Sequence, residues 1–94
     1  MAAEEALRLR NVSIGGALVE TPWPLSVDSV HRVRLESERH HAMVQARVRH
    51  VRASEDSECY VVGFEFVGVE PRVAEQLEQL VSRQLPMRGH VERT

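Results

Sequence analysis

The switch from strand to helix that decides the fold falls in residues 60–77, which read YVVGFEFVGVEPRVAEQL. In the first part, apolar residues recur at every second position, which is the period of a strand with one buried face. After Gly68 they recur at the three- and four-residue spacing of an amphipathic helix. Proline is tolerated in the first turn of a helix, so Pro71 suits its start. The stretch therefore predicts a strand over residues 60–67 and a helix over 71–85.

The residues before this stretch also alternate between apolar and polar. The alternation covers four segments, at residues 7–10, 17–20, 29–36 and 43–52. In the last of them the pattern changes face beside His50, as it does at a β-bulge. Prolines on both sides of Trp23 exclude a central strand there, and we expect a loop that pins Trp23 in place. Polar turns are expected at residues 37–41 and 53–58. The pattern predicts a β-rich fold, a small antiparallel barrel with one C-terminal α-helix.

Length and charge limit the classes of function. The 94 residues allow one domain. We expect a polar lead at residues 1–6, the domain at 7–85 and a C-terminal tail at 86–94. All twelve basic residues are arginine, but the net charge is −2, which argues against a nucleic-acid partner held by bulk electrostatics. The chain also has too few aromatic residues for a base-stacking platform of its own.

The sequence carries no catalytic motif, neither a phosphate loop nor H-E-x-x-H nor G-x-S-x-G. It therefore predicts no catalytic residues and no enzyme. His40 and His41 have no acidic or thiol ligand set beside them, so no metal site is expected. Cys59 is the only cysteine, which favours a reducing compartment. No apolar run approaches the roughly 18 residues of a membrane span, and no signal peptide is visible. We expect a cytoplasmic chain without membrane insertion.

One short motif points to a family. Asn11-Val12-Ser13-Ile14-Gly15-Gly16 fits the pattern [D/N]-x-S-x-x-G. The Pro-rich loop, the strands ending in Val48-Arg49-His50-Val51 and in Gly63-Phe64-Glu65-Phe66, and a single helix follow it in order. In this sequence of elements the chain resembles a PilZ domain over roughly residues 7–85. The resemblance implies a six-stranded antiparallel barrel with a C-terminal helix, and a regulatory role in bacterial cyclic di-GMP signalling.

The resemblance also implies a binding site. Asn11 and Ser13 would hydrogen-bond a guanine edge, and Gly16 would let the ligand approach the turn closely. The family's second motif, R-x-x-x-R, lies upstream and supplies arginines that grip phosphate and stack on guanine. No two arginines of this chain are four positions apart, and we expect the first family strand to be missing with the motif. Arg8 and Arg10 are the nearest substitutes.

Two readings of these residues stay open. In the first, the chain is a non-catalytic cyclic di-GMP module that acts through a protein partner in a bacterial signalling pathway. In the second, it is a degenerate PilZ-like adaptor that binds no nucleotide. The motif then forms a hairpin turn whose residues bond only the backbone, and Arg8 and Arg10 are a solvated strand face. Four more arginines on an outer face, Arg32, Arg34, Arg47 and Arg49, are read as a solvated charge ladder, with a docking face for an acidic partner as the alternative.

A barrel that lacks one strand would expose an edge, and exposed edges recruit partners. Homodimerisation or docking on another protein would cover both this edge and Trp23.

Overall fold

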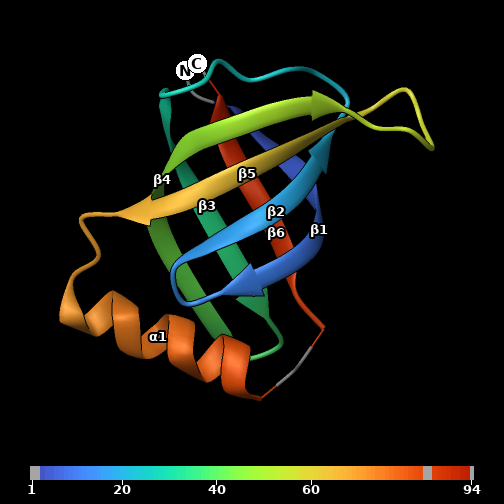
Figure 1. Ribbon diagram of the computed structural model, residues 1–94. Helices are drawn as coiled ribbons and strands as arrows, with labels where there is room; N and C mark the ends of the chain where they lie inside the picture. Colours follow the sequence, from blue (N-terminus) through green and yellow to red (C-terminus); the bar gives the residue numbers. More distant parts are fainter. Residues whose placement is uncertain (1–2, 84–85, 94) are drawn as a thin grey trace.

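Six strands and one helix make up the computed structural model, which describes residues 3–83 and 86–93 (Figure 1). In chain order they are β1 (Ala3–Ser13), β2 (Gly16–Thr21), β3 (Val30–Ser37), β4 (His40–Ala53), β5 (Tyr60–Val67), α1 (Pro71–Ser82) and β6 (Arg88–Arg93). All neighbouring strands are antiparallel, and they close a barrel in the order β1-β2-β5-β4-β3-β6. The structure confirms the predicted antiparallel barrel with one helix.

Strand alternation builds the barrel interior. The inward positions hold the apolar residues that the sequence pattern placed there, and most of them have no solvent exposure. This core includes Val19, Val33, Leu35, Ala46, Val48, Val62, Phe64 and Val91. Because successive residues of a strand point to opposite faces, the same pattern places the charged residues outside.

The helix closes one mouth of the barrel, at the end that carries the β1–β2 and β3–β4 turns (Figure 1). Leu77 and Leu80 are fully buried in the core cluster. Burying a leucine side chain contributes about 1.5–3 kcal/mol, which fixes the helix on the barrel. The helix ends at Ser82 with Arg83 as its C-cap, earlier than the predicted end at residue 85. Leu85 itself lies outside the described residues.

The last strand is the main correction to the sequence-based expectation. Residues 88–93, expected to be a tail, form β6, which pairs with β1 on one side and β3 on the other. Residues 3–6, expected to be part of a polar lead, belong to β1 and pair with β6. Within the described residues the barrel therefore has no open strand edge. Trp23 is partly buried and packs against the core of its own domain. The open edge that was expected to recruit a partner is therefore absent from the described part of the chain, and homodimerisation or docking on another protein stays a prediction.

The hairpin between β3 and β4 is longer than predicted. His40 and His41, expected in a turn, begin β4 and pair with Ser37 and Glu36. The start of β4 could not be recognised from the sequence, because the polar side chains of an exposed hairpin tip show no apolar alternation. The predicted irregularity beside His50 is confirmed, since the β4–β5 register shifts between Val48 and His50.

Candidate functional site

The motif turn lies on the outer surface of the barrel, where β1 turns into β2. Asn11 and Ser13 are exposed, and Val12 between them packs against the core. The Ser13 Oγ accepts a hydrogen bond from the Gly15 N–H at 3.3 Å and donates one to the Gly16 carbonyl at 3.4 Å. Both distances are long for hydrogen bonds, so the hydroxyl orders the turn without being strongly held by it.

A β-bulge brings the arginines onto the same side as the motif. The β1–β2 register shifts between Leu9 and Asn11, so Arg10 and Asn11 are both exposed although they are consecutive. A regular strand would place them on opposite faces. The bulge therefore gathers Arg8, Arg10, Asn11 and Ser13 on one surface. The two adjacent polar residues at 10 and 11 are the only sign of it in the sequence.

Gly16 has a structural role of its own. A side chain built at this position would overlap the backbone carbonyl oxygen of Phe64 on β5. The Phe66 N–H also donates to the Gly15 carbonyl at 2.9 Å, which ties β5 to the turn. Glycine is therefore required for the close approach of two strands. The contact between Gly16 and a ligand stays a prediction.

A row of four residues extends the surface away from the turn. Asn11 pairs with Leu18, Leu18 with Gly63, and Gly63 with His50, across β1, β2, β5 and β4. A side chain at Gly63 would overlap the His50 imidazole, so the ring lies directly over the glycine backbone. His50 is exposed, and Gly63 is buried beneath it. We call Leu18 and the His50 ring, which lie in this row beyond Asn11, the floor. Sequence reasoning missed this floor, because strand pairing alone brings these residues together.

We call this surface the open face, defined by Arg8, Arg10, Asn11, Ser13, Leu18 and His50. Next to the turn it contains a shallow hollow of about 380 Å³ lined by Asn11, Ser13 and Leu18, among others. Arg8 is 3.7 Å from the Glu20 carboxylate, but its side chain is 83% exposed. Such a solvated ion pair is weak, so Arg8 remains available to another anion.

A second polar surface lies on β1, β3 and β6, and we call it the paired face. It consists of Glu4, Arg32, Arg34, Glu36, His90 and Glu92. Arg34 contacts Glu4 at 2.8 Å, and Arg32 contacts Glu92 at 3.6 Å. Acidic and basic groups alternate across the strands here, as in a solvated charge ladder. On β4, Arg49 similarly lies 3.9 Å from Glu65.

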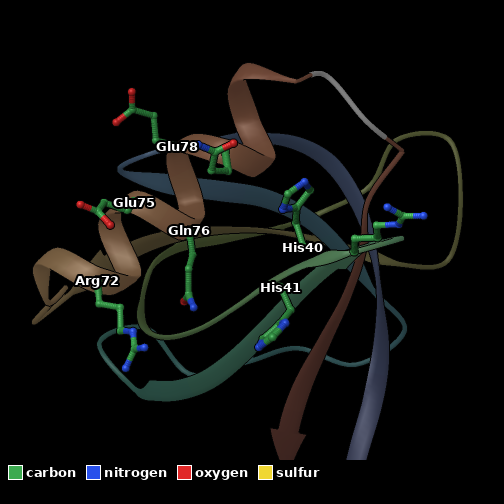
Figure 2. Close-up of a pocket in the computed structure, with 8 residues that line it drawn as sticks. His40, His41, Arg72, Glu75, Gln76 and Glu78 are labelled. Carbon is green, nitrogen blue, oxygen red and sulfur yellow. The ribbon is translucent and has the colours of Figure 1, made fainter.

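Another hollow is a cleft of about 530 Å³ between the β3–β4 hairpin and α1 (Figure 2). His40 and His41 face it from the hairpin, and Arg72 and Gln76 face it from the helix (Figure 2). Its two arginines are balanced by two glutamates, so it offers no net charge to an anion. Within residues 3–83 and 86–93, no three metal-ligating side chains come together.

Comparisons with known proteins identify one family. The chain matches the family model described as PilZ domain over residues 2–83, which includes β1 to β5 and α1 and leaves β6 outside the match. No curated protein and no solved structure matches the chain. In the part of the chain that the structure describes, no helix is long and apolar enough to span a membrane.

Proposed function

Because the chain belongs to the PilZ domain family, a family of cyclic di-GMP-binding signalling domains, we propose that it binds cyclic di-GMP on its open face and catalyses no reaction. The observation that carries the proposal is the exposure of Asn11 and Ser13 beside Arg10, which the bulge turns to the same side. These three side chains supply an amide, a hydroxyl and a guanidinium to a single ligand.

The chemistry of each group suits one part of the ligand. The Asn11 amide both donates and accepts hydrogen bonds, as the edge of guanine does. The floor of Leu18 and the His50 ring offers a flat surface on which a purine can stack. Arginine binds a phosphodiester through two parallel N–H···O bonds. The base would then lie over the floor, with its edge toward β1 and the phosphates toward the arginines.

The bound ligand would act as a signal for a protein partner in the bacterial cytoplasm. Binding adds two negative charges to a surface that carries Arg8 and Arg10, and so changes the charge that a partner meets.

One observation favours the second candidate function, a PilZ-like adaptor that binds no nucleotide. The Ser13 hydroxyl already bonds the backbone of its own turn, and no two arginines are spaced as in the family's R-x-x-x-R motif. In that case the motif is only a hairpin turn, and the protein partner binds the domain without a ligand.

Calorimetric titration with cyclic di-GMP separates the two functions. We expect micromolar or tighter binding, and a roughly fivefold to tenfold loss of affinity in Asn11→Ala and in Ser13→Ala. Ser57→Ala is the matched control, because Ser57 is also an exposed loop serine whose Oγ accepts the N–H two residues on at 3.3 Å. It lies in the β4–β5 loop, away from the open face, so it should bind as the wild type does. A folded wild type that releases no heat would leave the adaptor function standing.

A further inference from the structure

The sixth strand places an arginine beside the open face. The β1–β6 register ends with Leu7 paired with Gly89, so Arg88 follows directly at the end of this ladder that leads toward Arg8. On its other side, Arg88 pairs with Glu36 of β3. An arginine far from the motif in the sequence thus lies beside the part of β1 that leads into the motif.

The side chain of Arg88 points outward. A side chain built at Gly89 would lie 2.8 Å from Leu9 Cδ2, which shows that the Gly89 position faces the core. Arg88 is adjacent in the strand and therefore faces the opposite way, and it is exposed. Arg8 and Arg10 are exposed on the neighbouring strand. Three guanidinium groups from two strands share one surface next to the motif.

Two of these groups lack a counter-charge. Glu36, the carboxylate opposite Arg88, is 3.3 Å from His90 Nε2 and 3.9 Å from Arg34 Nε. Glu20 lies against Arg8. Among the residues that the structure describes, neither Arg10 nor Arg88 forms an ion pair. This end of the barrel surface therefore carries unneutralised positive charge, unlike the balanced cleft beside α1.

We propose that Arg88, together with Arg10, grips the phosphodiester groups of the nucleotide bound on the open face. The inference rests on the proposed function and adds the source of its cationic contact. The strand that follows the helix thereby contributes a cationic contact of its own to the open face. Two unpaired guanidinium groups match the two phosphate charges of a cyclic dinucleotide, and each forms bidentate bonds that lysine does not reproduce.

Titration of the full chain with cyclic di-GMP tests the assignment. We expect Arg88→Gln to weaken binding roughly tenfold, and Arg88→Lys to recover only part of the loss. The loss in Arg88→Gln should shrink at high ionic strength, because salt screens a contact between charges. Arg72→Gln is the matched control. Arg72 is exposed on α1 and has no ion pair among the described residues, but it faces the other cleft.

The outcomes are distinct. Wild-type affinity in a folded Arg88→Gln variant would overturn the role of Arg88 while the proposed function stands. Equal losses in Arg88→Gln and Arg72→Gln would also overturn it, because the effect would then be one of net charge alone. A wild type that does not bind would overturn both the function and the inference. Unchanged thermal melting of Arg88→Gln shows that its loss of binding is not a loss of the barrel.

Discussion

The open face and the paired face carry similar residue types on neighbouring strands, but they are built for different ends. On the paired face, Arg34 lies between Glu4 and Glu36, and Glu36 also contacts His90. On the open face, Arg10 has no such partner among the residues that the structure describes, and Asn11 and Ser13 are exposed beside it. Side chains that already satisfy one another have little to gain from a ligand, whereas unpaired donors and cations do. The contrast between the two faces locates the candidate site better than the depth of any hollow.

The largest expected effect is a loss of stability from a substitution in the turn beside the open face. Gly16→Ala should destabilise the domain by about 2–3 kcal/mol, because the new methyl group overlaps the Phe64 carbonyl and two strand backbones must separate. The free energy of unfolding in urea measures this loss. Gly15→Ala is the control, since nothing lies within 4 Å of a side chain built there. Equal stability of the two variants would contradict the structural role given to Gly16.

A smaller effect is expected from the paired face. Arg34→Gln removes the 2.8 Å contact with Glu4 and should cost about 0.5–1 kcal/mol of unfolding free energy, in the range of a partly exposed ion pair. The loss should decrease at high salt, because the contact is electrostatic. Cyclic di-GMP affinity should stay at the wild-type value. A large drop in affinity would show that the paired face belongs to the site, and the contrast between the faces would fail.

The smallest effect on stability is expected from Gly63→Ala, which tests the part of the open face formed by His50. Gly63→Ala introduces a methyl group where the His50 ring lies. The ring is at the end of an exposed side chain and moves aside easily, and alanine is less costly than glycine inside a strand. We expect stability to change by less than about 0.5 kcal/mol. The NMR signals of the His50 ring should shift, and ligand affinity should fall with the loss of the floor. Unshifted ring signals would contradict the packing of His50 on Gly63.

Most of the fold could be predicted from apolar alternation, and the parts that could not be are the polar ones. Five strands and the helix carry regular apolar positions, which is why their periods are visible. The inward positions of β6 include Gly89 and Val91, and one large apolar residue between charged neighbours is too weak a pattern to recognise. The first residues of β1 were missed as well. They pair with β6, and without β6 the sequence offers no partner strand for them.

The residues of the candidate site also differ in how far the sequence could predict their positions. The exposed position of Asn11 and Ser13 beside a turn could be predicted, because the pattern is contiguous in sequence. Their contact with a ligand stays a prediction. The roles proposed for His50 and Arg88 depend on strand register across the barrel, and nothing in the local sequence encodes that register. The bulge at Arg10 lies between these cases. It breaks the alternation visibly, but only the observed β1–β2 register shows which face Arg10 takes.

The position of β6 after the helix also sets the order in which the domain is completed during translation. Five strands and α1 leave the ribosome before residues 88–93, and until then β1 and β3 each keep an unpaired edge. The final step joins segments separated by almost the whole chain, and closing so long a loop is entropically costly and slow. Unpaired edges of this kind are the usual route to aggregation. A premature stop or a fusion junction between α1 and β6 therefore produces a barrel with two open edges, not a slightly shorter domain.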